Sequence, residues 1–331
     1  MLTVRRVAPD DVDAHALWSA QERDLAERYD DPELVLETSF PTLIGSWVGY
    51  TEDGLAVASI VARWAPYEET GPGDVELKRL WVDPAHRGRG YARVMMGVAE
   101  KASHRAGATR LILETGTEQP EAMALYESIG WKPMAPYGEY RDEPDSRCYA
   151  RPLPTRVLVI NGTMGAGKTT VAAAIHDLLR DAGAHAGYVD ADFLCQATPR
   201  PHDDPFLQGL LFDNLASIAP HYRRRGIGLM VVPRVVEDAT DRERYGTAFS
   251  SADAGVAEVT IARVDAPQEV RIARLTAREP EGYWQEFAHA RTVELDGILR
   301  GLDLDDVVVD NAGDRDRLEV AAEVLEQADW A

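Results

Sequence analysis

The stretch ELKRLWVDPAHRGRGYARVMMGVAEKA, residues 76–102, decides the fold of the first half of the chain. Its apolar start predicts a strand over Glu76–Val82, and its later part predicts a helix over Tyr91–Gly107 that ends at a glycine cap. Gly88 and Gly90 stand at the mouth of this helix, where glycine lets backbone N–H groups approach an anion closely. The helix N-terminus adds partial positive charge. The segment therefore predicts a site for a pyrophosphate group.

A second glycine-rich turn, residues 162–170, follows the predicted strand Val157–Asn161 and opens the predicted helix Val171–Ala182. It has the pattern G-x-x-x-x-G-K-[ST] between a strand and a helix, the setting in which such a loop binds phosphates. Lys168 would meet the β- and γ-phosphates of a nucleotide, and the Thr169 hydroxyl would ligate Mg²⁺. We expect ATP and Mg²⁺ here, bound by Gly162, Thr163, Met164, Gly165, Ala166, Gly167, Lys168, Thr169 and Thr170.

The length of the chain, 331 residues, predicts two domains. The prolines of Pro152-Leu153-Pro154 can continue neither a helix nor a central strand, so they indicate a short stiff linker. We therefore expect one domain over residues 1–152, a linker at 153–154 and a second domain over 155–331.

The two halves differ in the order of their expected elements. In the first half strands and helices are mixed, with hairpin character around Glu52-Asp53-Gly54. In the second half, helices alternate with short strands rich in β-branched residues, which is typical of a buried parallel sheet. Strands are expected at Thr3–Val7, Thr42–Tyr50, Leu55–Trp64, Glu76–Val82, Leu111–Glu114, Val157–Ile160, Ala186–Val189, Gly228–Pro233, Val259–Val264 and Val307–Val309, and further helices at Val12–Arg28 and Pro120–Ile129.

The composition limits the classes of function. A net charge of −21 argues against a non-specific grip on nucleic acid and against adhesion to anionic membranes, but it suits a cationic small-molecule substrate. Cys148 and Cys195 stand far apart and form no disulfide framework or zinc pattern. The N-terminal segment does not resemble a signal peptide, and no long apolar run suggests a membrane span. A cytoplasmic location is expected.

Roughly the first 150 residues resemble the GCN5-related N-acetyltransferase (GNAT) family. The resemblance rests on Asp-Pro-x-x-Arg-Gly-x-Gly-x-Ala between a strand and a helix, followed after the next strand by Ala122–Trp131. It implies an α+β fold with a mixed, mostly antiparallel sheet, and acetyl-CoA as the cofactor. The residues that it implies for cofactor binding are Leu80, Trp81, Val82, Arg87, Gly88, Arg89, Gly90, Tyr91, Ala92 and Gln119, the last standing where many relatives have Asn.

The same resemblance implies catalytic roles. Tyr126 would be the general acid that protonates the leaving CoA thiolate, since a phenol stays protonated at neutral pH. Attack on a thioester needs a neutral amine, so a carboxylate must take up a proton. Glu76 is the first candidate for this base, although it could instead be a strand carboxylate paired with Lys78 or Arg79. Glu114 is the second candidate.

The second half resembles the small P-loop kinases, which implies a P-loop NTPase fold with a parallel sheet flanked by helices. By this resemblance, Asp190 and Asp192 are candidates for the base, and Asp190 also for the metal, although Asp192 could merely cap a helix over Phe193–Gln196. Arg271 and Arg274 resemble lid arginines that stabilise the transferred phosphoryl group, but a solvated basic stripe would look the same. Asn311 follows a strand that lies beside adenine in such kinases.

These features together predict a bifunctional transferase that N-acetylates an amine and phosphorylates a small-molecule hydroxyl. One antibiotic or natural product that carries both groups would explain the fusion. The third predicted strand has no acid until Glu237, which favours a metabolite kinase over a motor or switch ATPase. Alternatively, the P-loop domain could bind a nucleotide and regulate the acetyltransferase without phosphotransfer. A third possibility is acetylation of protein or tRNA, and the acidic charge weighs against tRNA.

Overall fold

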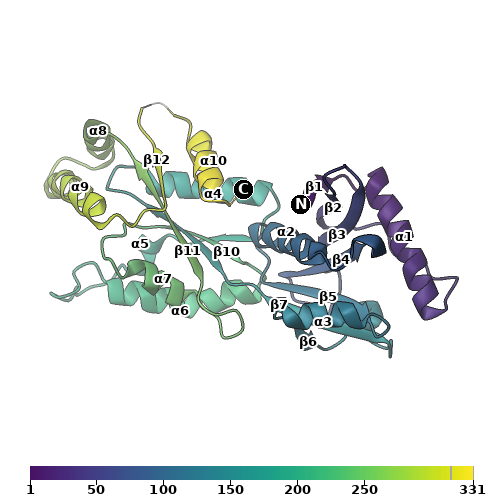
Figure 1. Ribbon diagram of the computed structural model, residues 1–331. Coiled ribbons are helices and arrows are strands. Elements are labelled where there is room, and N and C mark those ends of the chain that lie inside the picture. Colours follow the sequence, from purple (N-terminus) through teal and green to yellow (C-terminus); the bar gives the residue numbers. More distant parts are fainter. Residues whose placement is uncertain (314, 331) are drawn as a thin grey trace. The chain divides into compact units, whose positions relative to one another are not determined.

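The computed structural model describes residues 1–313 and 315–330 and divides into two compact units, Met1–Leu153 and Pro154–Ala331 (Figure 1). Each unit has its own sheet and its own apolar core. Within the described residues, no helix combines the length and the apolar composition that crossing a bilayer requires.

The first unit is built on a mixed sheet with the strand order β1-β2-β3-β4-β5-β7-β6. Neighbouring strands are antiparallel except β4 and β5, which run parallel, so the predicted mixed and mostly antiparallel sheet is confirmed. Its elements are β1 (Thr3–Val7), α1 (Val12–Tyr29), β2 (Leu43–Tyr50), β3 (Ala56–Trp64), β4 (Asp74–Val82), α2 (Tyr91–Arg105), β5 (Arg110–Gly116), α3 (Pro120–Ser128), β6 (Lys132–Met134) and β7 (Ser146–Pro152), with short 3-10 helices at Pro84–His86 and Gly138–Tyr140.

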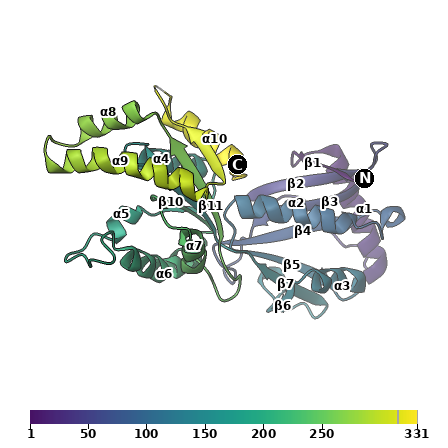
Figure 2. The ribbon, with the colours of Figure 1, turned by 60° about the vertical axis from the view of Figure 1, so that its left-hand side comes forward.

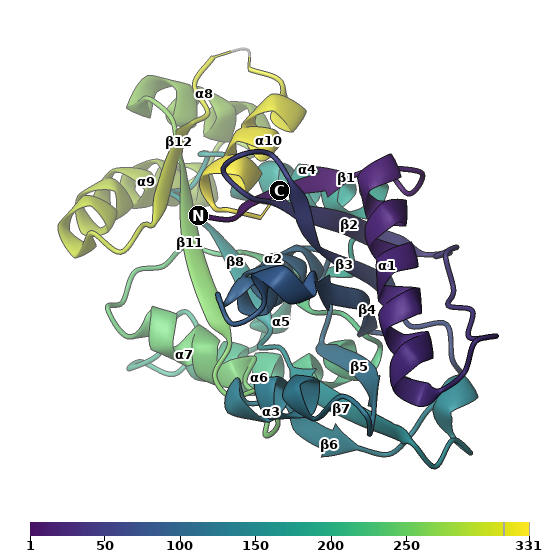
Figure 3. The ribbon, with the colours of Figure 1, turned by 45° about the vertical axis from the view of Figure 1, so that its right-hand side comes forward.

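Alternation along the strands places apolar residues on both faces of this sheet, and α1 and α2 cover opposite faces. On β2 and β3, Trp47 and Ile60 pack in the core that contains Met95 of α2. Their neighbours Val48 and Val61 pack in the core that contains residues of α1. Figure 3 shows the strands β2 and β3 between α1 and α2. The Asp11 carboxylate caps α1 by accepting two backbone N–H bonds at 3.0 Å, which explains why the helix begins there.

The parallel pair β4–β5 is short. Only the three pairs from Asp74↔Arg110 to Glu76↔Ile112 are in register, although both strands continue further. Arg110 Nε and Nη2 donate to the two Asp74 carboxylate oxygens at 2.9 and 2.5 Å and hold the strands together where they begin. Beyond the paired residues the strands part, which leaves an opening at their carboxyl ends.

The second unit is built on a parallel sheet with the strand order β12-β11-β8-β10-β9, which confirms the predicted parallel pairing. Its elements are β8 (Arg156–Asn161), α4 (Lys168–Asp181), β9 (Ala186–Tyr188), α5 (Ala191–Leu194), α6 (Gln208–Arg224), β10 (Leu229–Pro233), α7 (Asp241–Ala248), β11 (Glu258–Asp265), α8 (Gln268–Arg278), α9 (Tyr283–Leu302), β12 (Val307–Asp310) and α10 (Arg317–Gln327).

Helices cover both faces of this second sheet, as the continuous apolar strands predict. Leu158 and Ile160 of β8 pack with α4 and α10, while Val157 and Val159 pack with α6 and α7. Figure 2 shows α4 and α10 on one side of the strands and α6 and α7 on the other. The strand β8 lies between β10 and β11. After β8, the next two strands of the chain, β9 and β10, lie on one side of it, and the last two, β11 and β12, lie on the other side. Where the strand order reverses in this way, a crevice for a ligand forms at the carboxyl ends of the strands.

Two predicted helix starts are wrong. Helix α4 begins at Lys168 rather than at Val171, because the lysine already has helical geometry after Gly167. Helix α5 begins at Ala191 rather than at Phe193, and its cap is the Asp190 carboxylate, which accepts from the Asp192 N–H at 3.0 Å. The cap therefore stands two residues earlier than the Asp192 cap that the sequence suggested.

Replacing Asp74 by Ala should lower the free energy of unfolding of the first unit by about 3 kcal/mol, because the buried partner of Arg110 is lost. Urea unfolding followed by tryptophan fluorescence measures this, since five of the seven tryptophans lie in the first unit: Trp18, Trp47, Trp64, Trp81 and Trp131. The exposed Asp142→Ala is the control. An equal loss in both variants would contradict a special role for Asp74.

Candidate functional site

The glycine-rich turn before α2 borders a cavity of about 420 Å³, here called the cradle cavity. Gly88 and Gly90 have φ of 77° and 80°, and a Cβ at either position would have open space around it. Gly90 also caps α2 without a side-chain hydrogen bond, so the first N–H groups of this helix are not occupied by a capping side chain. The lining includes Leu80, Trp81, Val82, Arg87, Gly88, Gly90, Tyr91, Ala92, Gln119, Ala122, Leu125 and Tyr126.

Most of the expected cofactor-binding residues of the first unit are thus brought together, and Arg89 is the exception, since it is exposed and outside the lining. Arg87 is held by the protein itself: its Nε donates to the Val82 carbonyl at 3.0 Å and its Nη2 to the Asp24 carboxylate at 2.5 Å. Burial raises the pKa of Asp24, but hydrogen bonds from Trp81 and Arg87 outweigh this and leave it below its usual value. Asp24 was not among the residues expected from the sequence, because it lies on α1, 63 residues before Arg87.

A second cavity, of about 290 Å³, lies where β4 and β5 part and is here called the carboxylate cavity. Four glutamates border it: Glu37, Glu76, Glu114 and Glu139. The lining also includes Lys78, Arg79 and Tyr140. The residues that it shares with the cradle cavity are Leu25, Leu80, Gln119 and Tyr126. The two cavities therefore meet at the Tyr126 side chain.

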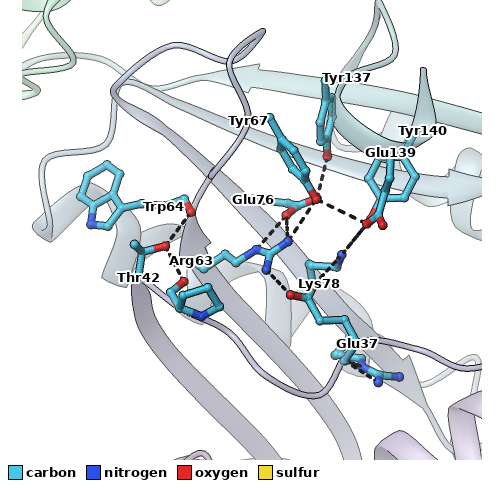
Figure 4. A network of polar contacts seen from close by, with 12 residues as sticks. Glu37, Thr42, Arg63, Trp64, Tyr67, Glu76, Lys78, Tyr137, Glu139 and Tyr140 are labelled. Atoms are coloured by element: carbon cyan, nitrogen blue, oxygen red, sulfur yellow. Dashed lines mark hydrogen bonds and ion pairs between the residues drawn. The ribbon is translucent and has the colours of Figure 1, made fainter. Parts of the chain in front are cut away.

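Glu76 is buried, with 1% of its surface exposed, and its carboxylate is fully engaged (Figure 4). Arg63 Nε donates to it at 2.9 Å, Arg63 Nη2 lies at 2.8 Å, and the Tyr137 hydroxyl donates at 3.1 Å. The alternative that Glu76 is an exposed carboxylate paired with Lys78 or Arg79 is wrong. Its partner Arg63 is on β3, and the pair arises because Arg63 and Glu76 are register partners.

Glu114 is in a different state. Its Oε1 accepts a hydrogen bond from Ser146 Oγ at 2.7 Å, and no ion pair with a cation is found for it among the described residues. Burial raises the pKa of Glu114 above its usual value, and the hydrogen bond from Ser146 offsets this only in part. A carboxylate of raised pKa that borders a cavity is suited to accept a proton near neutral pH.

Tyr126 is 5% exposed and packs against Trp131 and Tyr149. Burial raises its pKa well above the usual value, with the charge of Glu114 as a further cause, so the phenol is protonated at working pH. Among the described residues, none is hydrogen-bonded to its hydroxyl, which leaves the proton available to a ligand.

In the second unit, the turn at residues 162–170, here called the glycine loop, leads from β8 into α4 at the predicted place. Gly162, Gly165 and Gly167 have φ of 142°, 78° and 101°, which residues with side chains rarely adopt. Lys168 Nζ donates to the Thr163 carbonyl at 3.1 Å, and burial lowers the pKa of this amine to about 8. Thr169 and Thr170 are exposed at the start of the helix.

The arginines of α8 support the glycine loop. Arg271 is 2% exposed, and its Nη1 donates to Thr163 Oγ1 and to the Asp296 carboxylate, both at 2.9 Å. Arg274 Nη2 donates to the Asn311 carbonyl at 2.9 Å. Arg271 is therefore not part of a solvated stripe. Asn311, expected beside adenine, donates its side-chain N–H to the Ala166 carbonyl at 2.7 Å and so also holds the loop.

The two candidate acids of the second unit, Asp190 and Asp192, have different hydrogen-bond and ion-pair partners. Asp190 caps α5, and burial raises its pKa. Asp192 is exposed and pairs with Arg234, which is 8% exposed and stands at the end of β10. Among the described residues, no group of three or more His, Cys, Asp or Glu side chains is arranged to hold a metal ion, so a metal here would depend on nucleotide phosphates.

Part of the first unit is similar to known acetyltransferases. The family model "Acetyltransferase (GNAT) family" matches residues 13–131. The IAA acetyltransferase of Azospirillum brasilense is 35% identical over 85 residues, which are 26% of this chain and 56% of that relative. N-acetyltransferase 8 of Homo sapiens is 40% identical over 58 residues, which are 18% of this chain and 26% of that protein.

The chain thus spans about half the length of the first of these curated relatives and about a quarter of the second. Among solved structures, an IAA acetyltransferase from Bacillus cereus is similar with a TM-score of 0.34 and 16% identity, over 46% of this chain and 100% of that chain. The matched residues 13–131 contain both the cradle cavity's glycine turn and Tyr126. From residue 13 to residue 131, the chain is therefore a domain of the acetyltransferase (GNAT) family.

Proposed function

We propose that the first unit is an acetyl-CoA-dependent N-acetyltransferase. The observation that carries this proposal is the meeting of the two cavities at Tyr126: one is bordered by an anion-binding glycine turn, and the other contains a carboxylate of raised pKa. The cradle suits the pyrophosphate of CoA, because Gly88 and Gly90 leave room beside the start of α2. When bound, acetyl-CoA supplies an activated acetyl group.

We assign the role of general base to Glu114 rather than to Glu76. The oxygens of Glu76 already accept hydrogen bonds from Arg63 and Tyr137, so both are occupied by protein donors rather than open to a substrate amine. Glu114 takes the proton of the substrate ammonium, and the resulting neutral amine attacks the acetyl carbonyl. As the carbon–sulfur bond breaks, the Tyr126 hydroxyl would donate its proton to the leaving thiolate. The newly acylated nitrogen would then give its extra proton to the Tyr126 phenolate, which restores the hydroxyl and leaves a neutral amide. Glu76 then serves to position Arg63 and Tyr137, the two side chains that donate hydrogen bonds to it.

The Glu114→Gln variant should lose about 100-fold in kcat, the usual contribution of a general base. A protonated carboxyl cannot accept a proton, so the wild-type rate should fall on acidification once the pH passes the raised pKa of Glu114, above the 4.5 of an ordinary glutamate. This acidic limb should be absent in the variant. CoA release measured from pH 5 to 9 tests both points.

The exposed Glu118→Gln is the matched control and should keep the wild-type pH profile. A limb caused by ionisation of the substrate amine is common to all variants. If the rate of the Glu114→Gln variant still falls on acidification as the wild-type rate does, Glu114 is not the base.

The Tyr126→Phe variant should keep its affinity for acetyl-CoA and lose about 100-fold in kcat, because the leaving thiolate is no longer protonated. Tyr149→Phe is the matched control: this hydroxyl bonds Glu127 at 3.1 Å, and the residue is absent from the lining of both cavities. Steady-state rates with a fixed amine distinguish the two. Equal loss in both variants would point to a packing effect and not to acid catalysis.

For the second unit we propose ATP-dependent phosphotransfer to a small-molecule hydroxyl. The glycine loop lies at the sheet edge where the strand order reverses, and its glycines have the positive φ that turns N–H groups inward. Lys168 is the one lysine in the sequence of residues 154–331, where arginine is used throughout. A lysine on this loop, followed by Thr169, suits nucleotide phosphates with Mg²⁺.

Within this proposal Asp192 is the base and Arg234 orients it. Asp192 is exposed toward solvent yet paired with a buried arginine at the end of a central strand. Asp190 is the weaker candidate, because its carboxylate is occupied as the cap of α5. Arg271 and Arg274 hold the glycine loop in shape rather than contacting the transferred phosphoryl group.

The Lys168→Ala variant should bind ATP at least about 30-fold more weakly, since a charged partner of the phosphates is removed. Asp192→Asn should bind ATP as the wild type does but release no ADP with an acceptor present. Arg180→Ala, exposed at the other end of α4, is the control. If Lys168→Ala alters acetylation while neither variant changes ADP release, the unit is a nucleotide-dependent regulator and not a kinase.

A further inference from the structure

The carboxylate cavity is bordered by a buried cation, Arg79, that has no direct ion pair among the described residues. The charges of Glu22 and Glu37 act on it without an ion-pair contact, and its Cζ lies 5.6 Å from the centre of the Trp18 ring. Arg79 is 6% exposed. Its Nε and Nη2 donate to the Glu37 carbonyl oxygen at 2.9 and 2.6 Å, and its Nη1 donates to Gln21 Oε1 at 3.5 Å. These acceptors are neutral. Among the described residues, no carboxylate lies within ion-pair distance of Arg79.

The backbone explains why this arginine is here. Val61 pairs with Lys78 and Ser59 pairs with Trp81, so Arg79 and the next residue oppose a single residue of β3. Such a β-bulge redirects a side chain, and bulges gather beside active sites. Arg79 has φ of 57°, a left-handed conformation that costs free energy in a residue with a side chain. The bulge occurs where β4 leaves β5.

Burying a guanidinium without a direct ion pair is unfavourable, and burial lowers the pKa of Arg79 to about 10 although the charges of Glu22 and Glu37 act in the opposite direction. The group is still a cation at neutral pH. A guanidinium has five N–H donors, and three are used in the contacts above, which leaves one on each terminal nitrogen. Two parallel N–H groups are the arrangement that binds a carboxylate best.

The other charges of the cavity are matched, except one. Glu37 pairs with Arg63 and Lys78, and Lys78 also lies 3.6 Å from Glu139. Glu76 pairs with Arg63. Glu114 is left with a hydrogen bond from Ser146 and no cation within ion-pair distance among the described residues. The cavity is thus bordered by one buried cation and one carboxylate that form no direct ion pair among the described residues.

We propose that the acetyl acceptor is a zwitterion, a free amino acid whose carboxylate binds Arg79 and whose amino group lies at Glu114. This rests on the proposed acetyltransferase function. A plain amine or polyamine would leave Arg79 buried without an anion, so the acidic net charge of the protein does not by itself select the substrate. The volume of about 290 Å³ is at the small end for ligand sites and suits a single amino acid beside an acetyl group.

The test uses the full chain, acetyl-CoA and the twenty standard L-amino acids, with N-acetylated products read by mass spectrometry. Each amino acid that is acetylated is then compared with its decarboxylated amine, for example phenylalanine with 2-phenylethylamine. The amino acid should have at least about 30-fold higher kcat/KM, since an amine without the carboxylate loses the pairing with Arg79.

Variants at Arg79 distinguish a loss of substrate binding from a loss of folding. Arg79→Gln should raise KM for the amino acid about 30-fold or more, leave kcat within a factor of about three, and leave the decarboxylated amine unaffected. Arg79→Lys should recover part of the loss, because the charge is kept. Arg6→Gln is the matched control: Arg6 also donates to a backbone carbonyl, that of Ile44 at 2.6 Å, and lies outside the cavity.

The zwitterion proposal is wrong if the decarboxylated amines are acetylated as efficiently as the amino acids. It is also wrong if Arg79→Gln reduces kcat/KM equally for amines and amino acids. In both cases the proposed acetyl transfer stands. Acetylation of neither class overturns the zwitterion as well. In that case, binding of acetyl-CoA with slow CoA release from other amines would keep the proposed function, whereas no CoA release with any amine would remove both.

Discussion

The parting of β4 from β5 beyond the Asp74–Arg110 ion pair is the constraint on which the first site depends. Two parallel strands that stayed paired to their ends would close the sheet and leave no room for a ligand between them. Here three residue pairs hold the strands together, and the free ends then border a cavity from both sides. The bulge at Arg79 adds to this, because it turns β4 away at the same level.

The two glycine turns of the chain differ in how closely other residues pack against them. At Gly88 and Gly90 a side chain would meet open space, so these residues provide positive φ and access to a ligand. At Gly165 a Cβ would lie 2.7 Å from the Arg271 carbonyl oxygen, so this glycine is also needed by the packing of α8. The first turn is open, whereas the second is fastened by Arg271, Arg274 and Asn311.

Charged side chains at the first site form one connected set of ion pairs. Arg63 joins Glu37 to Glu76, Lys78 joins Glu37 to the 3-10 helix that contains Glu139, and these contacts hold the segment before β2 over the cavity (Figure 4). Each of these carboxylates is engaged by cations, whereas Glu114 has no direct ion pair among the described residues. For this reason the proposed mechanism gives the role of proton acceptor to Glu114 and positioning roles to the other three glutamates.

Local patterns in the sequence were sufficient for most strands and helices and for both glycine turns, since apolar periodicity and glycine chemistry act within a few residues. Tyr126 became a candidate through the family resemblance. The sequence alone also indicated that the second sheet is parallel. It could not show that Glu76 pairs with Arg63, that Arg271 is buried under the glycine loop, or that Asp190 is a cap.

Those facts depend on which distant segments meet. A bulge is a mismatch between two strands, so Arg79 has its position only once β3 and β4 are in register. The raised pKa of Glu114 likewise arises from burial by several elements. The sequence by itself determined the two glycine turns, because these are encoded in contiguous residues. The tertiary structure alone decided which carboxylate and which arginine lack a direct ion pair among the described residues, because charge pairing is a long-range property of the fold.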